Sequence, residues 1–286
     1  VNYVISNLKK ESQQRILKIF SCLAPNIPLE IEEFEKWFGC DDYNDVDDLI
    51  LRGWINEDSD RKMSMHQVIS DMIKYKHPIE KNTAKELLTN MTEALKESEG
   101  KDYKYINNLL QHSEAVIKNY PEKTEEEYGV FLIEAGKVYI NAGIYTEANE
   151  KLQKALSIFK EENVTDTASA YTYLGKSCIW DGKYEEAIKH LNKAKELLEG
   201  IDNKDSYIAD TYNYIGMYHY CIGEYTEALS YYIKSLAIKE KVLGTEHPDT
   251  AATYDNIAQL YQDQGDYSKA MQYDNKALAI KEKVLG

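Results

Sequence analysis

The sequence has little of what several large classes of protein require. Its 286 residues include only 5 prolines, 5 phenylalanines and 4 cysteines. Cys22, Cys40, Cys178 and Cys221 form no C-x-x-C pair, so we expect no metal or redox site but free thiols in a reducing cytoplasm. No apolar run approaches the roughly 20 residues of a membrane-spanning helix, and no signal peptide is visible, which argues against a membrane protein.

Basic residues are also scarce. The chain has 34 Lys and Arg against 49 Asp and Glu, a formal net charge of −15. Sequence-independent binding to nucleic acid requires clustered basic side chains that displace counterions, so the charge argues against a nucleic-acid partner. Hydrophobic residues make up 43% of the chain, which is enough to build a core.

Tyrosine, by contrast, is abundant, with 24 residues against 3 tryptophans. Several tyrosines belong to the pattern Gly-x-Tyr-x-x-Ala, which begins at Gly143, Gly182, Gly223 and Gly265, in steps of 39, 41 and 42 residues. Small residues recur seven positions before each glycine and seven after each alanine, on a helical face that a second helix can approach closely. Because a glycine after a helical run fits a helix stop with positive φ, each unit is predicted to be helix, tight turn, helix.

Four such units are expected over residues 124–286. Residues 78–123 are expected to form a helical connector with a degenerate capping repeat, which covers the end of such an array. The last segment, Lys283–Gly286, repeats Lys241–Gly244 without its continuation, and the chain begins at Val1 rather than methionine. We therefore expect the chain to be part of a longer protein, with its last unit truncated.

The repeated units resemble tetratricopeptide repeats. The resemblance rests on the Gly-x-Tyr-x-x-Ala turn and on the pairs Leu174-Gly175, Ile215-Gly216 and Ile257-Ala258. From Ala228 to Ala251 the sequence is similar to the repeats of kinesin light chain. The resemblance implies a superhelix of helix pairs that binds other proteins or peptides.

The repeat framework accounts for eleven tyrosines, which we expect to pack between neighbouring helices. One unit departs from the pattern, because Asp274 stands where Tyr232 stands one unit earlier. Asp274 is either exposed or paired across a helix interface, and we favour exposure. The framework tyrosines are Tyr103, Tyr139, Tyr145, Tyr171, Tyr184, Tyr212, Tyr225, Tyr232, Tyr254, Tyr261 and Tyr267.

The first helix of each unit is expected to line a concave groove, and register with Gly216 predicts which side chains it presents. Amides and hydroxyls there can hydrogen-bond a peptide backbone, while Met217, Tyr220 and Trp180 can hold an apolar side chain. We expect a protein or peptide ligand; the alternative is a solvated face. The predicted groove residues are Thr172, Lys176, Ile179, Asn213, Met217, Tyr220, Asp255, Gln259 and Gln262.

Residues 1–77 have a different periodicity and are predicted to form a separate small domain. Three helices followed by a β wing make a winged-helix arrangement. The predicted fold class is therefore all-α, with a small winged helix ahead of a tetratricopeptide superhelix. The predicted elements are helices over 11–23, 31–38, 45–52 and 66–75 and a short hairpin around the polar turn at 57–62.

A winged helix suggests DNA binding, but this one is acidic. Residues 1–80 contain 10 basic and 15 acidic side chains, and five aspartates lie within residues 41–48, where a recognition helix is expected. Phosphate would be repelled there, so we expect no nucleic-acid partner.

Three stretches of this domain, Leu8–Pro25, Asp47–Ile55 and above all Met65-His66-Gln67, are similar to the winged helix of signal-transduction ATPases with an NB-ARC module, the STAND class. That class has Met-His-Asp at this point, and Gln67 stands here in place of the aspartate. The resemblance implies that His66 contacts the β-phosphate of ADP in a nucleotide module outside this chain. The alternative is a histidine that only begins a helix.

No catalytic arrangement is visible. Gly175-Lys176-Ser177 resembles the end of a phosphate loop, but Ala170 stands where its first glycine belongs. We expect no enzyme and no cofactor in this chain, with ADP or ATP bound only in a longer parent.

The favoured function is the sensor region of a STAND ATPase. A protein or peptide trigger bound by the repeats would be coupled through the winged helix to nucleotide release and oligomerisation. The alternatives are a stand-alone interaction scaffold and a winged-helix transcription regulator with a repeat sensor.

Overall fold

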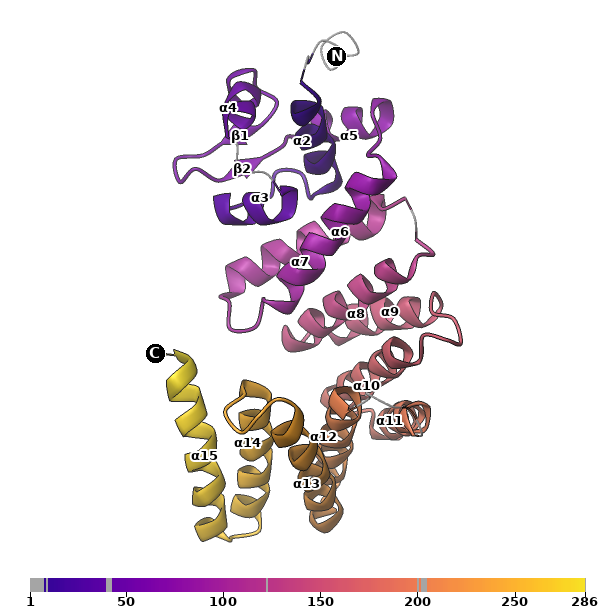
Figure 1. The fold of residues 1–286 in the computed structure, drawn as a ribbon, viewed down its shortest axis with the longest axis vertical. Coiled ribbons are helices and arrows are strands. Elements are labelled where there is room, and N and C mark those ends of the chain that lie inside the picture. The colour runs from indigo at the N-terminus through magenta and orange to yellow at the C-terminus, as the bar shows by residue number, and fades with distance from the viewer. Residues whose placement is uncertain are drawn as a thin grey trace. The chain divides into compact units, whose positions relative to one another are not determined.

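The described part of the chain is almost entirely helical. The computed structural model describes residues 8, 10–39, 43–121, 123–199, 201 and 205–285. Over these residues it contains fourteen α-helices and one two-stranded antiparallel sheet, divided between two compact units, Val1–Gly143 and Ile144–Gly286 (Figure 1). The predicted all-α class with a small β element is confirmed. Cys40, residues 41–42 and the two chain ends lie outside the described residues.

The first unit follows the predicted order of elements. Each of the four helices predicted within residues 1–77 begins and ends within one residue of its expected bounds, and two short strands enclose the polar turn. The elements are α2 (Glu11–Cys22), α3 (Ile31–Phe38), α4 (Asn44–Leu51), β1 (Asn56–Glu57), β2 (Met63–Ser64), α5 (Gln67–Lys76), α6 (Lys81–Lys96), α7 (Tyr103–Asn119) and α8 (Glu126–Asn141).

Three phenylalanines join the first helices. Phe20 of α2 packs against Phe38 of α3 with ring centroids 4.7 Å apart, and Phe34 lies 4.4 Å from Phe38. Leu29, which precedes α3, exchanges two backbone hydrogen bonds with Met63 of β2, and all five side chains are buried. The apolar stripe of each helix thus forms one core with the hairpin, as amphipathic periodicity requires.

Helix α7 contacts the end of α2 through a buried histidine. His112 is 1% exposed, and its Nδ1 accepts the backbone N–H of Ala24 at 3.2 Å. Its ring meets Trp37 edge-on, with centroids 5.4 Å apart. Burial lowers the pKa of His112 to about 4, so the contact is made by a neutral imidazole at neutral pH.

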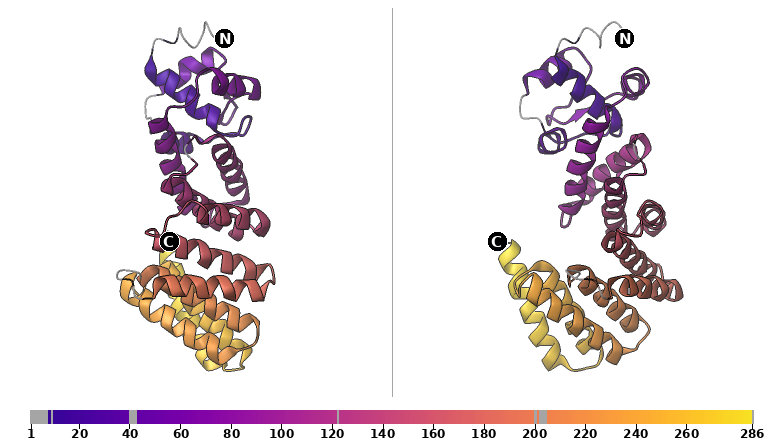
Figure 2. Two further views of the ribbon diagram at one scale, coloured as in Figure 1. Left: turned by 90° about the vertical axis from the view of Figure 1, so that its right-hand side faces the viewer. Right: turned by 45° about the vertical axis from the view of Figure 1, so that its right-hand side comes forward.

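The second unit consists of one helix followed by three helix pairs. In the views of Figure 2, α12 to α15 follow one another side by side, each pair joined by a tight turn. None of the described helices of the protein is long and apolar enough to cross a membrane. The helices of this unit are α9 (Tyr145–Leu156), α10 (Val164–Trp180), α11 (Tyr184–Leu198), α12 (Asp205–Cys221), α13 (Tyr225–Val242), α14 (Pro248–Asp263) and α15 (Tyr267–Leu285).

Glycines allow the paired helices to approach closely. A Cβ at Gly175 would lie 2.5 Å from Leu191 Cγ, and a Cβ at Gly216 would lie 2.6 Å from Tyr232 Cδ1. These distances are far below van der Waals contact, which explains the small residue predicted at each position. The predicted helix stops are confirmed by φ values of 74°, 82° and 77° at the turn glycines Gly182, Gly223 and Gly265.

The framework tyrosines do not all share one environment. Tyr232 and Tyr254 are 2% and 3% exposed, as predicted for residues packed between helices. For Tyr103 and Tyr267, which are 83% and 70% exposed, that prediction is wrong. Each stands at the first position of its helix, α7 or α15, and its ring is not covered by the described residues.

Asp274 is paired rather than exposed. Its side chain is half-buried and accepts a hydrogen bond from Gln262 Nε2 at 2.9 Å, which connects α15 to α14. The favoured prediction of exposure is therefore wrong. The hydrogen bond satisfies a carboxylate at a position where the preceding unit has a buried tyrosine.

Candidate functional site

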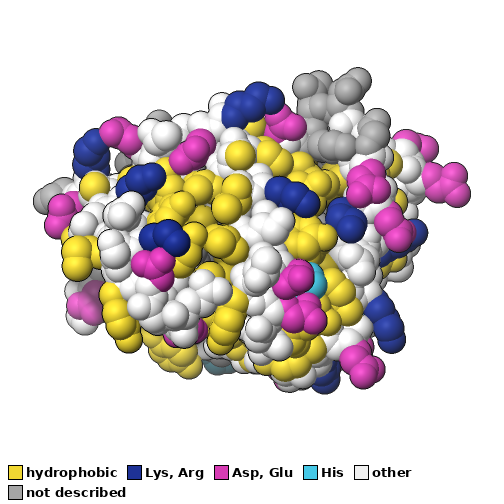
Figure 3. All heavy atoms as spheres, turned by 90° about the horizontal axis from the view of Figure 1, so that it is seen from below, with side chains coloured by type: hydrophobic (Ala, Val, Ile, Leu, Met, Phe, Trp, Pro, Cys, Tyr) yellow, Lys and Arg dark blue, Asp and Glu magenta, His cyan; other side chains and the backbone are white. Residues whose placement is uncertain are grey.

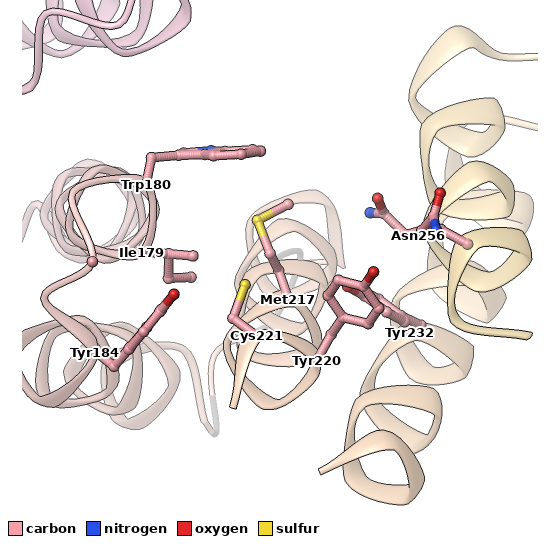
Figure 4. A pocket seen from close by; sticks show the side chains of 10 residues that line it. Ile179, Trp180, Tyr184, Met217, Tyr220, Cys221, Tyr232 and Asn256 are labelled. Carbon is pink, nitrogen blue, oxygen red and sulfur yellow. The ribbon is translucent and has the colours of Figure 1, made fainter. Parts of the chain in front are cut away.

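The second unit has a pocket on the face formed by α10, α12 and α14. Its volume is ≈ 380 Å³, within the range typical of ligand pockets. Side chains from these helices converge on it, together with Tyr184 of α11, which lies near Ile179, and Tyr232 of α13, which lies beside Tyr220 (Figure 4). The lining residues are Ile179, Trp180, Gly182, Tyr184, Met217, Tyr220, Cys221, Tyr232, Asn256 and Gln259.

One wall of the pocket is apolar. Ile179 and Trp180, from the last turn of α10, lie opposite Met217 of α12 (Figure 4). Ile179 is only 3% exposed, whereas Trp180 is 56% exposed because α10 ends at this residue and the chain turns away. A large aromatic side chain left open beside a buried apolar floor is well suited to cover an incoming apolar group.

The opposite wall, on α14, is polar. Asn256 Nδ2 donates to Asn213 Oδ1 at 3.0 Å, and Gln259 Nε2 donates to Asp263 Oδ1 at 3.1 Å. The Tyr220 hydroxyl donates to the other oxygen of Asp263 and so links α12 to α14. Burial and the neighbouring carboxylate raise the pKa of Tyr220 to about 12, so this hydroxyl stays protonated at neutral pH.

The surface around the turns of this unit also carries exposed apolar side chains. Figure 3 shows the face on which the turns after α12 and α14 lie, where hydrophobic patches alternate with charged and polar side chains. Ile222, in the turn after α12, is 38% exposed, and Met271, near the start of α15, is 64% exposed. Neither lines the pocket.

Four of the nine predicted groove residues line the pocket: Ile179, Met217, Tyr220 and Gln259. They come from all three inner helices, so the structure brings these four side chains together. Trp180, predicted to act with Met217 and Tyr220, lies in the same pocket.

The other five predicted residues make contacts within the protein. Thr172 is 2% exposed, and its hydroxyl lies 2.8 Å from that of Thr211, between α10 and α12. Asn213 is 8% exposed and accepts the hydrogen bond from Asn256. Lys176 lies over the ring of Tyr214, 5.4 Å from its centroid.

The last two predicted residues lie on α14. Asp255 forms an ion pair with Lys281 of α15 at 2.7 Å, and Gln262 donates to Asp274. Neither lines the pocket. Gln262 occupies the same repeat position as Tyr220, which lines the pocket, so position within the repeat does not by itself decide which side chain reaches the pocket.

Besides Trp180, five pocket residues are not in the predicted set: Gly182, Tyr184, Cys221, Tyr232 and Asn256. A sequence signal existed for one of them, because Asn256 occupies the same repeat position as Tyr173 and Tyr214. Those two tyrosines pack edge-on with centroids 5.9 Å apart, so this position of successive units lies between neighbouring first helices. Tyr184 and Tyr232 lie on second helices, which reasoning from the first helices alone does not examine.

In the first unit, His66 is the N-cap of α5. Its Nδ1 accepts the backbone N–H of Val68 at 3.2 Å, and the side chain is exposed. Nε2 is the ring nitrogen left for an outside partner. No group of three or more metal-ligating side chains is found in the residues that the structure describes.

Sequence comparison identifies the repeats. The family profile of the tetratricopeptide repeat matches residues 207–283, which include most of α12 and all of α13 and α14. The predicted tetratricopeptide repeats are therefore confirmed in this stretch. No curated protein matches the chain.

Solved structures share the fold at low identity. A Rap protein complexed with competence and sporulation factor has a TM-score of 0.60 and 18% identity, over 74% of this chain and 58% of that one. Aspartyl phosphate phosphatase F from Bacillus subtilis has a TM-score of 0.55 and 17% identity, over 76% and 55% of the two chains.

A STAND protein with a tetratricopeptide repeat sensor, from Pyrococcus horikoshii, matches 99% of this chain at a TM-score of 0.51 and 18% identity. The match covers 46% of that structure. This chain therefore spans about half the length of each of the three. At these identities the likeness supports the predicted tetratricopeptide superhelix fold and not a shared activity.

Proposed function

We propose, starting from the tetratricopeptide repeats of residues 207–283, that this chain is the sensor region of a STAND-type ATPase. In this proposal the groove of α10, α12 and α14 binds a protein or peptide trigger. The N-terminal helices, which we propose form a winged-helix domain over residues 1–77, transmit that event to a nucleotide-binding module outside this chain. Residues 78–123 would connect the two as a capping pair of helices.

The observation that carries ligand binding is the pocket. It combines an apolar floor with an amide wall, and this is the composition that holds one side chain and the adjoining backbone of a peptide. The Rap protein of similar fold is itself complexed with a factor, which supports a groove of this type as a binding surface.

The coupling role rests on His66. Its hydrogen bond from Val68 fixes the ring at the start of α5 and leaves Nε2 exposed, which fits a donor to phosphate oxygens. The likeness to the STAND protein, which extends over 99% of this chain, supports the same assignment. An ADP bound in a longer parent would supply the phosphate charge that His66 detects.

A stand-alone interaction scaffold is the second candidate. It requires only the pocket and the repeats. The stretch from Ala228 to Ala251, which is similar to the repeats of kinesin light chain, fits this candidate as well as it fits the STAND proposal. The two candidates differ in one measurable property, because only the STAND proposal ties His66 to nucleotide. In the full-length protein His66→Ala should shorten ADP retention, while Gln67→Ala on the next residue serves as control. Unchanged nucleotide content in His66→Ala would favour the scaffold.

Ligand binding can be followed through tryptophan fluorescence. Trp180 is 56% exposed, whereas Trp37 and Trp54 are 1% and 8% exposed, so a ligand in the pocket should shift the emission of Trp180 alone to shorter wavelength. Peptides selected from a random display library serve as the probe.

Two methionines offer a matched pair for this test. Met217→Ala removes part of the pocket wall and should weaken binding by about 1–2 kcal/mol. Met271→Ala changes an exposed methionine of α15 outside the pocket and should bind like the unmodified chain. Equal affinity in both variants would remove the pocket from the proposal.

A further inference from the structure

We infer that the pocket selects a basic–apolar peptide segment, with a large apolar side chain in the pocket and a neighbouring lysine or arginine paired with Asp263. The inference rests on the proposed function of the groove as a peptide-binding surface and adds the chemistry of the ligand. Three features of the described residues support it: a carboxylate that has no cation beside it, the amide oxygens on α14, and the position of the apolar wall across the pocket from them.

Asp263 carries an exposed charge with no cation beside it among the described residues. Its two hydrogen-bond donors, Tyr220 and Gln259, are both neutral side chains. Two other carboxylates on the inner helices have a lysine beside them, since Asp210 pairs with Lys239 at 2.9 Å and Asp255 pairs with Lys281 at 2.7 Å. Asp263 differs from these two, because neutral donors hold it in place and leave its charge to accept a cation.

The amides next to Asp263 also offer acceptors. Asn256 and Gln259 each direct an NH₂ group to a neighbouring side chain, Asn213 Oδ1 and Asp263 Oδ1. Their carbonyl oxygens are left for an incoming donor. Together with the carboxylate they form a wall that suits backbone N–H groups and a guanidinium or ammonium group.

The apolar wall defines the other half of the ligand. Trp180, Ile179 and Met217 lie across the pocket from α14, so an apolar side chain placed among them leaves an adjacent residue of the peptide facing the polar wall (Figure 4). The net charge of −15 attracts a basic segment at long range and so favours the same partner.

Asp263→Asn is a mild test of this pairing. The asparagine keeps one oxygen, which can accept from Tyr220 or from Gln259, while the charge is lost. Asp263 does not line the pocket itself but is hydrogen-bonded to two residues that do, Tyr220 and Gln259. Asp255→Asn is the matched control, because it removes the same charge from the same helix at a carboxylate that Lys281 already pairs. For a ligand cation at a partly exposed carboxylate, we expect Asp263→Asn to weaken binding about threefold to tenfold, and Asp255→Asn to leave it unchanged.

The experiment selects peptides from a random display library with three baits: the unmodified chain, Asp263→Asn and Asp255→Asn. Peptides enriched on the unmodified chain and on Asp255→Asn should place Lys or Arg beside a large apolar residue, and those enriched on Asp263→Asn should keep only the apolar residue. The most enriched peptide is then synthesised, together with a copy in which citrulline replaces arginine or norleucine replaces lysine. Each peptide is titrated into the protein, and binding is followed by Trp180 fluorescence. Removing the positive charge of the peptide should lower its affinity for the unmodified chain and leave its affinity for Asp263→Asn unchanged.

The outcomes separate this inference from the function on which it rests. Enriched peptides whose binding depends on Met217 but that carry no basic residue would overturn the inference and keep the binding function. The same conclusion would follow if Asp263→Asn and Asp255→Asn weakened peptide binding equally. A selection that yields no peptide sensitive to Met217→Ala would overturn both.

Discussion

Replacing Gly216 with alanine is the most direct test of how the repeats pack. Gly216 lies on α12, where its backbone faces Tyr232 of α13. An added Cβ would lie 2.6 Å from Tyr232 Cδ1, 2.8 Å from Cε1 and 3.2 Å from the carbonyl oxygen of Ala228. Tyr232 is 2% exposed, so its ring has no solvent into which to move.

Two opposing effects determine the magnitude. An extra methyl group in a well-packed interface costs about 1–3 kcal/mol through shifted side chains and backbone. Alanine in place of glycine within a helix recovers about 1 kcal/mol of helix propensity. We expect a net loss of up to about 2 kcal/mol for Gly216→Ala, which corresponds to a decrease in Tm of up to about 8 °C for a unit of this size.

The assay is thermal and urea denaturation of Gly216→Ala, of Tyr232→Ala and of the double variant. Because the two residues are in contact, the losses should not add: in Tyr232→Ala the space for the new methyl exists, and Gly216→Ala should then be neutral or stabilising. Tyr232 also lines the pocket, so Gly216→Ala alone should weaken peptide binding. An increase in Tm for the single variant, or simple additivity, would refute the close approach of α12 and α13.

Three further predictions concern stability. The folded-state pKa of His112 is about 4, below its ordinary value of 6.5, so between these pH values the unfolded chain takes up a proton that the folded chain does not. The free energy of unfolding should therefore fall by up to about 3 kcal/mol as the pH decreases from 6.5 to 4. Denaturation curves of His112→Asn should show a weaker dependence on pH. Thr172→Val should cost about 1 kcal/mol in urea denaturation by removing the 2.8 Å hydrogen bond to Thr211, with no effect on peptide affinity, and a clear loss of affinity would return Thr172 to the groove. Asp210→Ala should cost about 2–3 kcal/mol by the same assay, because it leaves Lys239, whose side chain is 7% exposed, without its carboxylate; a neutral effect would mean that the lysine reaches solvent.

Local patterns predicted the helices well because each helix reports its own periodicity. The bounds of α2 to α5 differ from prediction by at most one residue. The turn glycines were predicted from their place after a helical run, and their positive φ follows from local backbone sterics. The seven-residue spacing around Gly216 likewise predicts a close approach of two helices, and Gly216 indeed lies against Tyr232.

Side-chain direction within the groove was predicted less well. Thr172 and Met217 were both assigned to the groove, yet Thr172 is buried against Thr211 while Met217 lines the pocket. The repeat equivalent of Met217 is Lys176, which lies four residues after Thr172 and therefore on the same helical face. Which of these side chains is covered depends on how α10, α12 and α14 pack. Asp274 shows the same limit: its partner Gln262 belongs to another helix, and nothing in the local sequence indicates the pairing.

The many tyrosines and the many acidic residues of the sequence are related in the folded protein, because tyrosine hydroxyls donate hydrogen bonds to carboxylates. Tyr220 donates to Asp263, Tyr254 donates to Glu240, and other rings fill the spaces between helices. A phenolic hydroxyl is a neutral donor, so it can satisfy a carboxylate without adding a charge, which phenylalanine cannot do. The high tyrosine content thus suits a chain with many carboxylates.

The sequence alone determined the repeat unit, its helices and its turns, because these depend on interactions between residues close together in the chain. Only the tertiary structure decided that Trp180, Met217, Tyr220 and Asn256, which come from three different helices, surround one pocket. It also decided that Asp263 is held by two neutral donors, Tyr220 and Gln259, which line that pocket. The physical reason is that a pocket depends on the packing of helices far apart in the sequence, and local periodicity leaves that packing open.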